Sequence, residues 1–328
     1  MPDGASLSQP PAPALDVAGL TVRFHRRDAE IAAVSDVSFA LKPCETLTIL
    51  GESGSGKSVT LKALMGLLPA QAKVTGAVNL AGRSILGLPA AELSALRGRR
   101  ISMVFQEPIT ALDPVYTIGR QIAETIVRHD GTDERTARTR ARALLELVRI
   151  PAAERRLGSY PHEMSGGMRQ RAMIALALAC SPDVLLADEP TTALDVTVQI
   201  QILLLLRQLQ EELGMAIVFV THDVGVAAEI SDRVAVMYAG RFVETGSVRE
   251  IIRAPRHPYT TGLLGSSVHG GRRGTVLTTI PGAPPDLAAL PPGCAFAPRC
   301  HRAMDRCKVG HPPVVTHGSH SVRCVREV

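Results

Sequence analysis

The stretch Thr46-Leu-Thr-Ile-Leu-Gly-Glu-Ser-Gly-Ser-Gly-Lys-Ser-Val-Thr60 decides the fold. Its residues 51–58 match the pattern G-x-x-x-x-G-K-[S/T] in full, between an apolar run that predicts a strand and a stretch at 59–68 that predicts a helix. Glycines in such a loop let backbone N–H groups curl around phosphate oxygens, and the helix that follows adds the positive end of its dipole. The alternative, a flexible Gly/Ser linker, does not explain the strand before the loop or the helix after it.

The loop therefore predicts a nucleotide-binding site. We expect Lys57 to reach the β- and γ-phosphates and the Ser58 hydroxyl to bind Mg²⁺. The residues predicted to contact the nucleotide here are Gly51, Glu52, Ser53, Gly54, Ser55, Gly56, Lys57, Ser58 and Val59.

Three more apolar runs end in polar residues suited to phosphate chemistry. Predicted strands and helices alternate along this part of the chain, which favours an α/β fold with a parallel sheet. In open α/β sheets, ligands bind at the carboxyl ends of the strands, so the residues that follow these runs are expected to meet at one site. The runs and the residues after them are 101–105 with Gln106, 184–187 with Asp188 and Glu189, and 217–220 with His222.

These four polar side chains suggest distinct roles. Asp188 can hold Mg²⁺ through water, and Glu189 can polarise an attacking water. Gln106 can complete the metal shell, and His222 can form a hydrogen bond with a γ-phosphate oxygen. Each residue taken alone is as readily a turn, surface or capping residue, so the interpretation depends on their joint placement.

A second glycine pair opens another predicted helix. Residues 165–167, Ser-Gly-Gly, precede the helix at 168–179 and place a hydroxyl and two glycines at its start, which is typical of phosphate-binding helix ends. By spacing alone, an ordinary serine N-cap is the favoured interpretation. Asp195 is likewise expected to cap the helix at 196–213, which Gly214 ends.

Taken together in chain order, these motifs resemble the ATP-binding cassette of ABC transporters, namely its P-loop, Q-loop, signature, Walker B, D-loop and switch histidine. The resemblance covers roughly residues 14–250. It implies an α/β P-loop cassette with a parallel-sheet core, an antiparallel β subdomain and a helical insert at about 107–182. It also implies an ATPase that works as a head-to-tail dimer, with two ATP molecules sandwiched between the cassettes.

The same resemblance implies roles for individual residues. Glu189 would be the general base, Asp188 a Mg²⁺ partner, and Phe24 the aromatic residue that stacks on adenine. Asp195 would belong to the D-loop. The residues implied to act in trans, on the ATP held by the partner's P-loop, are Ser165, Gly166 and Gly167.

The composition narrows the function classes. The 328 residues are 45% hydrophobic, which supports a substantial core, whereas aromatic residues make up 3% and Trp is absent. This scarcity argues against binding of single-stranded nucleic acid, which needs aromatic stacking platforms. No apolar run approaches the roughly 20 residues of a membrane span, and the first residues lack the features of a signal peptide, so we expect a cytoplasmic chain. The net charge of +5 is equally compatible with a nucleotide ligand, an anionic membrane surface and plain solubility.

We expect three parts along the chain: a disordered tail at 1–13, the cassette at 14–256, and a small Pro/Cys-rich C-terminal domain at 257–328. Four of the six cysteines fall in the last part. In a cytoplasmic chain, such clustering indicates a metal before disulfides. The spacing lacks the tight pair of zinc ribbons, which favours an iron–sulfur cluster over Zn²⁺, with metal-free thiols as the third alternative. The predicted ligands are Cys294, Cys300, Cys307 and Cys324.

A narrower resemblance comes from 160–171, 187–196, 257–260, 280–285 and the closing cysteines. These segments are similar to the first of the two ATPase subunits of oligopeptide/dipeptide importers, a group that includes nickel importers and some members with a [4Fe–4S] cluster. The resemblance implies a peripheral ATPase on the cytoplasmic side of the inner or plasma membrane that drives import of di- and oligopeptides, with nickel as the alternative cargo. The implied partners are a second ATPase subunit in a heterodimer, two transmembrane permeases, and a periplasmic or lipid-anchored substrate-binding protein. A soluble ABC ATPase acting on nucleic acid or ribosomes is disfavoured, because those relatives carry two cassettes or a long coiled coil.

Two positions depart from the family pattern. The signature reads Met164-Ser-Gly-Gly-Met168 instead of the commonest Leu-Ser-Gly-Gly-Gln, which puts the contribution of Met168 in question. Cys44 stands where the family usually has glycine in a turn, which predicts a strained or altered turn there.

Overall fold

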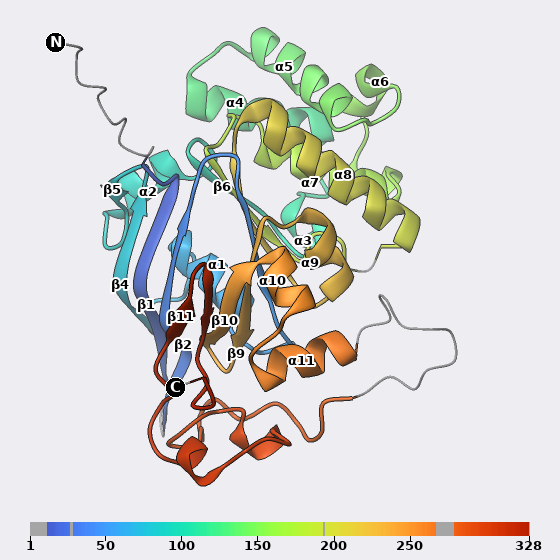
Figure 1. The fold of residues 1–328 in the computed structure, drawn as a ribbon. Coiled ribbons are helices and arrows are strands. Elements are labelled where there is room, and N and C mark those ends of the chain that lie inside the picture. Colours follow the sequence, from blue (N-terminus) through green and yellow to red (C-terminus); the bar gives the residue numbers. More distant parts are fainter. Residues whose placement is uncertain (1–11, 27–28, 193, 267–278, 328) are drawn as a thin grey trace, which may run out of the picture.

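The structure is a computed structural model that describes residues 12–26, 29–192, 194–266 and 279–327. The predicted tail at 1–13 lies outside the described residues, apart from residues 12 and 13. Figure 1 shows two neighbouring sheets, a group of helices at one end of the molecule and an irregular C-terminal segment at the opposite end. Within the described ranges, every helix is too short or too polar to cross a bilayer.

The described elements follow one another in the order of Figure 1. The strands are β1 (Leu15–Arg26), β2 (Ala29–Leu41), β3 (Thr46–Leu50), β4 (Ala72–Leu80), β5 (Arg83–Ser84), β6 (Ile101–Val104), β7 (Val184–Asp188), β8 (Ala216–Thr221), β9 (Arg233–Tyr238), β10 (Arg241–Ser247), β11 (Val315–His317) and β12 (His320–Val322). The α-helices are α1 (Lys57–Leu64), α2 (Ala90–Leu96), α3 (Pro108–Ala111), α4 (Ile118–Asp130), α5 (Glu134–Leu147), α6 (Ala153–Leu157), α7 (Gly166–Ala177), α8 (Val196–Leu213), α9 (Val224–Ile230), α10 (Val248–Arg253) and α11 (Pro258–Gly265). The 3₁₀ helices are η1 (Pro161–Glu163), η2 (Ala297–Arg299) and η3 (Asp305–Lys308).

The larger sheet has the strand order β11-β12-β10-β9-β3-β8-β7-β6. Its five strands from β9 to β6 pair in parallel. Strands β3, β7 and β8 are buried along their whole length, because helices or the second sheet cover both faces of such strands and the sequence reads as a continuous apolar run. The four strands that the sequence groups together are neighbours here, so the expected α/β core is confirmed.

The second sheet is antiparallel, with the order β2-β1-β4-β5. Its buried side chains, among them Val22 and Val34, share one apolar core with Ile49 of β3 and Leu61 of α1. This sheet is the expected antiparallel β subdomain. The shared core fixes it against α1 and therefore beside the phosphate-binding loop.

The chain between β6 and β7 is a bundle of helices, α3 to α7. On α4, Ile118, Ile122 and Ile126 recur at four-residue spacing and are buried together with Ala141 and Leu145 of α5. Such spacing places apolar side chains on one face of a helix, and that face becomes the core of the bundle. The helical insert expected at about 107–182 is therefore helical, with its first and last helices at α3 and α7.

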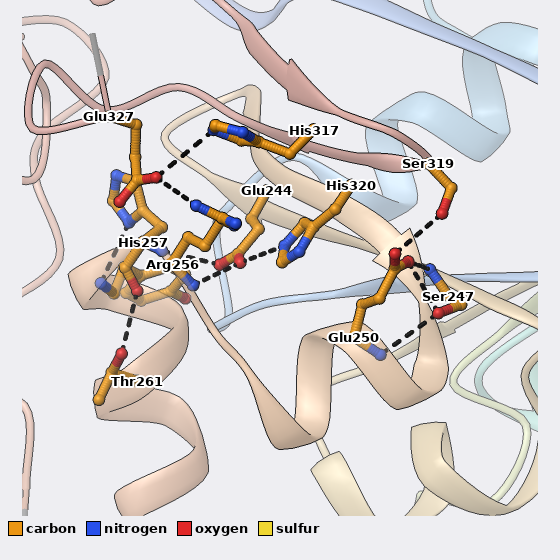
Figure 2. Close-up of polar contacts among 11 residues, drawn as sticks. Glu244, Ser247, Glu250, Arg256, His257, Thr261, His317, Ser319, His320 and Glu327 are labelled. Atoms are coloured by element: carbon orange, nitrogen blue, oxygen red, sulfur yellow. Dashed lines mark hydrogen bonds and ion pairs between the residues drawn. The ribbon is translucent and has the colours of Figure 1, made fainter.

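The C-terminal residues join the larger sheet through the hairpin β11–β12. Strand β12 pairs with β10, where Glu244 lies opposite Val322. The Glu244 carboxylate, 1% exposed, accepts hydrogen bonds from the backbone N–H groups of Arg256 and His257 at 2.7 and 3.0 Å. Its Oε1 also lies 2.6 Å from Nε2 of His320 (Figure 2). These contacts attach the hairpin to the cassette, and a domain boundary at residue 257 stays a prediction.

Candidate active site

The loop between β3 and α1 fits so closely against its neighbours that two of its positions require glycine. A Cβ at Gly51 would lie 2.3 Å from the carbonyl oxygen of Met237, and a Cβ at Gly56 would lie 2.5 Å from that of Ala33. Gly56 also has a φ of +107°, which side chains other than glycine rarely adopt. The glycines of the motif therefore shape the loop itself.

The loop carries one buried hydroxyl that is left without a partner. Ser55 is 5% exposed, and its Oγ has no hydrogen-bond partner among the described residues. Buried polar groups in native proteins are nearly always paired, so such an atom points to a ligand that supplies the partner. A phosphate oxygen at the start of α1 fits that requirement.

Lys57 begins α1 and is held inside the loop. Its Nζ donates to the carbonyl oxygens of Gly51 and Glu52 at 2.8 and 2.9 Å, and the side chain is 4% exposed. Burial lowers the pKa of Lys57, while the nearby carboxylates of Glu189 and Asp188 oppose that shift. The loop thus keeps an ammonium group where phosphate oxygens can replace the two carbonyls.

Ser58 and Asp188 bring a hydroxyl and a carboxylate together. Ser58 Oγ donates to Asp188 Oδ1 at 2.7 Å and so joins the first turn of α1 to the end of β7. Burial raises the pKa of Asp188, and the hydrogen bond from Ser58 acts in the opposite direction. Oxygen donors of this kind suit Mg²⁺, so the chemistry of the pair fits the metal that the sequence predicts.

Glu189 follows β7 in the left-handed region, with a φ of +45°. Non-glycine residues rarely take this conformation, and it is concentrated at functional sites. The carboxylate is fixed from three sides: Oε2 accepts from Thr192 Oγ1 at 2.9 Å and lies 3.1 Å from His222 Nδ1, while Oε1 lies 3.7 Å from Lys57 Nζ. An oriented, mostly buried carboxylate of this kind can take a proton from a water molecule.

A cavity of about 650 Å³ unites most of the predicted residues. This volume lies within the usual range for small-molecule sites. Gly51, Ser55 and Asp188 are buried and do not line it. The lining residues are Ala33, Glu52, Ser53, Gly54, Gly56, Lys57, Ser58, Val59, Gln106, Glu189, Thr192, His222, Leu263, Ser266 and Leu287.

Some predicted residues lie elsewhere. Phe24 is half-buried and packs against the core shared by the two sheets, so the structure does not bring it to the cavity. Ser165 caps α7 by accepting from the Met168 N–H at 3.3 Å, and Asp195 caps α8 by accepting from the Val198 N–H at 2.9 Å. The capping interpretation of both residues is confirmed, and neither they nor the two glycines after Ser165 line the cavity.

Sequence reasoning missed the contribution of the C-terminal segment to this cavity. Leu263, Ser266 and Leu287 line it, and Arg299 binds the loop residue Glu52 across 247 positions of sequence. No local pattern connects segments so far apart. Thr192 was also missed, although its place three residues after Glu189 gives it the reach to contact that carboxylate.

The four C-terminal cysteines come together around one cavity of about 20 Å³, which is large enough for roughly one water molecule. All four are free thiols, and burial raises the pKa of Cys294, Cys300 and Cys324. Within the described ranges, no group of three or more His, Cys, Asp or Glu residues could hold a metal ion. The donors have the right chemistry, but this arrangement does not support the predicted iron–sulfur cluster.

Two protein-family profiles match the chain. The ABC transporter family matches residues 34–192, and the C-terminal region of oligopeptide/dipeptide transporters matches residues 243–307. The first match contains the phosphate-binding loop and the strand ends that carry Gln106, Asp188 and Glu189. The second contains three of the four clustered cysteines.

Whole-length relatives agree with these profiles. A protein of Brucella melitensis, provisionally named a peptide import ATP-binding protein, is 52% identical over 328 residues, covering 96% of this chain and 97% of that protein. The oligopeptide transport ATP-binding protein OppD of Haemophilus influenzae is 49% identical over 308 residues, covering 94% and 95%. OppD of Salmonella typhimurium is 49% identical, covering 93% and 92%.

Among solved structures, the dimeric ATP-binding cassette MJ0796 bound to ADP and Pi is similar with a TM-score of 0.64 and 31% identity, covering 72% of this chain and 99% of that one. CbiO1 of Clostridium perfringens, part of an ABC transporter complex, is similar with a TM-score of 0.63 and 28% identity, covering 74% and 92%. The chain therefore belongs to the ABC transporter family, as an ATP-binding protein of the oligopeptide/dipeptide group and an ATPase of the kind that couples hydrolysis to transport.

Proposed function

We propose that this chain hydrolyses ATP at the cavity between the loop 51–58 and Glu189, and that this reaction drives peptide import through separate membrane subunits. The observation that carries the proposal is the Glu189 carboxylate, held by Lys57, Thr192 and His222 beside the Ser58–Asp188 pair. A base, a phosphate cradle and metal-type oxygen donors thus meet in one cavity.

ATP is the substrate, and the loop is proposed to bind its phosphates. The backbone N–H groups of 51–56, the Ser55 hydroxyl and the Lys57 ammonium are the groups that would contact phosphate oxygens. The metal residues are Ser58, Asp188 and Gln106, which all lie at or directly beneath the cavity. Mg²⁺ bound there would neutralise charge on the phosphates.

Glu189 is proposed as the general base. Its Oε1 would accept a proton from the water that attacks the γ-phosphate, while Thr192 and His222 keep the carboxylate oriented through Oε2. His222 is more than half exposed and lines the cavity, so it can also contact a γ-phosphate oxygen. With both contacts, His222 would couple the presence of the γ-phosphate to the orientation of the Glu189 carboxylate.

Ser165, Gly166 and Gly167 are proposed to act on an ATP molecule held by a partner cassette. They lie outside the cavity of their own chain, and Ser165 and Gly166 are exposed at the start of α7. An exposed helix start with a free backbone is suited to anions. The similar MJ0796 cassette is a dimer, which supports the same arrangement for this chain. Phe24 and Asp195 keep the roles of adenine contact and D-loop residue as predictions only.

The proposed partners are a second ATPase subunit, two permeases and a substrate-binding protein, with this chain on the cytoplasmic side of the membrane. Ile109 and Val115 are both 68% exposed, and Phe105 is 37% exposed. These apolar side chains surround Gln106 in sequence, and exposed apolar side chains gathered in one place mark protein contacts. A permease that docks there would reach the residue that lines the ATP cavity.

Peptides are the proposed cargo, in preference to nickel. The relatives that cover nearly the whole chain carry names of peptide or oligopeptide transport. The C-terminal match is to oligopeptide/dipeptide transporters.

An iron–sulfur cluster at Cys294, Cys300, Cys307 and Cys324 stays a prediction from the sequence, with Zn²⁺ as its alternative. It rests on the four soft sulfur donors that the sequence supplies and not on their arrangement around the cavity, and no step of the ATPase reaction passes through it. Protein purified without oxygen would contain iron and sulfide near four per chain if the cluster exists. Zinc without broad visible absorbance, or thiols that titrate fully with no metal, would contradict it.

The replacement Glu189→Gln tests the catalytic proposal. The amide keeps the shape of the side chain but cannot take the proton, so ATP binding should stay within about threefold while hydrolysis falls at least about 100-fold. Binding is measured by calorimetry with MgATP, and hydrolysis by phosphate release. Glu211→Gln, on the exposed face of α8, is the matched control and should leave both unchanged. Hydrolysis by Glu189→Gln at the normal rate would remove Glu189 from the role of base.

A further inference from the structure

The phosphate-binding loop contains a carboxylate of its own. Glu52 is the second residue of the motif, and its side chain is 26% exposed at the edge of the cavity. Among the described residues that line the cavity, Lys57 is the one lysine or arginine, whereas Glu52 and Glu189 are both acidic. A negative charge in this loop opposes the binding of a triphosphate, because like charges repel over several ångströms in a partly buried site.

Arg299 lies against that carboxylate. Its Nη1 donates to Glu52 Oε2 at 2.7 Å and its Nη2 donates to Glu52 Oε1 at 3.1 Å. The Arg299 side chain is 6% exposed, so the pair is screened only weakly by solvent. Two parallel hydrogen bonds of this type fix both partners in orientation as well as in charge.

The guanidinium of Arg299 is itself held in place by the C-terminal segment and β9. Its Nε donates to the carbonyl oxygen of Pro281 at 2.9 Å, and Nη1 lies 3.4 Å from the hydroxyl oxygen of Tyr238. The guanidinium carbon lies 5.9 Å from the centre of the Tyr238 ring. This arginine is therefore built into the fold and is not a mobile surface charge.

A second contact ties the same loop residue to α11. The backbone N–H of Glu52 donates to the hydroxyl oxygen of Tyr259 at 2.9 Å. Tyr259 is fully buried, and its ring packs against Tyr238 and Phe296, with ring centres 4.5 and 5.4 Å apart. The backbone and the side chain of Glu52 are thus both held by residues outside the strand–loop–helix unit that carries the motif.

We propose that Arg299 is a positioning residue for ATP binding: it neutralises Glu52 and holds the phosphate-binding loop in its binding shape. The C-terminal segment then sets the affinity of the site for ATP through this ion pair, with Tyr259 supporting the backbone of the loop. The inference rests on the assignment of residues 51–58 as the phosphate-binding loop. Arg299 reaches the ATP only through Glu52.

The test is a charge cycle in the full-length chain with Arg299→Gln, Glu52→Gln and the double variant. Arg299→Gln leaves Glu52 unneutralised beside the phosphates, so the Kd for MgATP should rise about tenfold. Glu52→Gln removes the repelling charge together with the forked contact, so it should weaken binding less than Arg299→Gln does, and the double variant should return to within about threefold of the parent. The loss in Arg299→Gln should shrink as salt rises, because the repulsion is electrostatic.

Steady-state kinetics separate this role from a purely structural one. Arg299→Gln should raise KM for ATP about tenfold and leave kcat within about threefold, because the groups that perform the reaction are intact. Arg299→Lys keeps the charge and loses the forked geometry, so it should recover most of the affinity. Arg323→Gln is the matched control, since it removes another ion pair between the C-terminal segment and the cassette, with Asp36, and should leave KM unchanged.

The outcomes are decisive in both directions. If the double variant binds ATP as weakly as Arg299→Gln, charge on Glu52 is not the cause and the inference is wrong. If Arg299→Gln loses kcat and thermal stability together and salt has no effect, Arg299 only supports the fold. Should Lys57→Ala also bind ATP normally, the loop assignment itself fails; normal binding by Arg299→Gln alone overturns this inference and leaves the site assignment intact.

Discussion

Lys57 is the residue on which the proposed ATP binding depends most directly. It is the one lysine or arginine among the described lining residues, and its ammonium donates to the carbonyl oxygens of Gly51 and Glu52. Hydrogen bonds from a charged donor contribute about 1.5–3 kcal/mol, which corresponds to a change of roughly 10- to 100-fold in affinity. Lys57→Ala should therefore weaken MgATP binding by at least about tenfold in calorimetry. Lys308→Ala, which removes an exposed lysine far along the chain, is the control; equal binding by both variants would contradict the assignment.

His257 gives the folded chain a specific response to acid. Burial lowers its pKa from 6.5 to about 3, so it stays neutral in the folded state over the whole range in which the unfolded chain takes up a proton. The contribution of His257 to the free energy of unfolding is therefore fully present above about pH 6.5. It falls as the pH drops from 6.5 towards 3, by at most about 1.4 kcal/mol per pH unit. His257 caps α11 by accepting the Tyr259 N–H at 3.1 Å, and asparagine can replace that function.

The variant His257→Asn isolates this effect. Between pH 7 and pH 5.5 the parent chain should lose about 1 kcal/mol more of its free energy of unfolding than His257→Asn does, as measured by urea denaturation. Subtracting the variant removes the contributions of the other titrating groups. Equal losses in the two proteins would show that His257 is protonated in the folded state.

Among the elements, the hairpin β11–β12 depends on one buried carboxylate. Glu244 accepts the N–H groups of Arg256 and His257 and bonds to His320, as Figure 2 shows. Glu244→Ala would leave two buried donors, on His257 and His320, and the partly buried N–H of Arg256 without a partner. We expect it to lower the free energy of unfolding by about 3–5 kcal/mol. Glu92→Ala removes an exposed ion pair with Arg83 and should cost less than about 1 kcal/mol.

Hydrogen exchange would show which elements of Glu244→Ala lose stability. In Glu244→Ala, amides of β12 and of the first turn of α11 should exchange faster, while those of β3 and β8 stay protected. A loss confined to global stability, with no difference between these elements, would contradict the view that Glu244 attaches the hairpin.

The elements that the sequence predicts best are those whose signals are local. Strands β3, β7 and β8 are continuous apolar runs, and α8 has its bounds, its cap Asp195 and its end at Gly214 as expected. Cys44 is another local case: its φ of +58° is the left-handed turn conformation that favours glycine, as the sequence predicts for this turn. Met168 packs partly buried against the core of the helical bundle, which gives its side chain a structural place in the signature.

Long-range contacts account for what the sequence did not show. Phe24 lies on a strand whose partners, Ile31 and Ala72, come from two different segments, and it packs against the core of the two sheets. Its role as an adenine contact stays a prediction. The ion pair between Arg299 and Glu52 joins residues 247 positions apart in the sequence. The hairpin β11–β12 pairs with the cassette sheet although its residues follow a proline-rich stretch. Hydrophobic periodicity and capping patterns depend on residues close together in the sequence, so they do not predict contacts between residues that lie far apart in it.

At the scale of the whole molecule, the relevant parts are the ATP cavity, the proposed permease contacts and the C-terminal segment that contacts the phosphate-binding loop. The ATP cavity lies at the carboxyl ends of the parallel strands, and the helices α4 to α6 and the C-terminal segment lie at opposite ends of the molecule (Figure 1). Ile109, in α3, and Val115 are exposed and are the proposed permease contacts. The C-terminal segment holds the loop through Arg299, and α11 holds it through Tyr259.

The central claim is that ATP hydrolysis by this chain drives peptide import, and uptake into vesicles tests it most directly. The complex is purified through this chain from native membranes, reconstituted, and supplied with a labelled peptide and its binding protein. We expect two permeases and a second ATPase subunit in the complex, ATP-dependent uptake of the peptide, and loss of that uptake with Glu189→Gln. Uptake of Ni²⁺ without any peptide uptake, or recovery of the chain with ribosomes and no permease, would contradict the account.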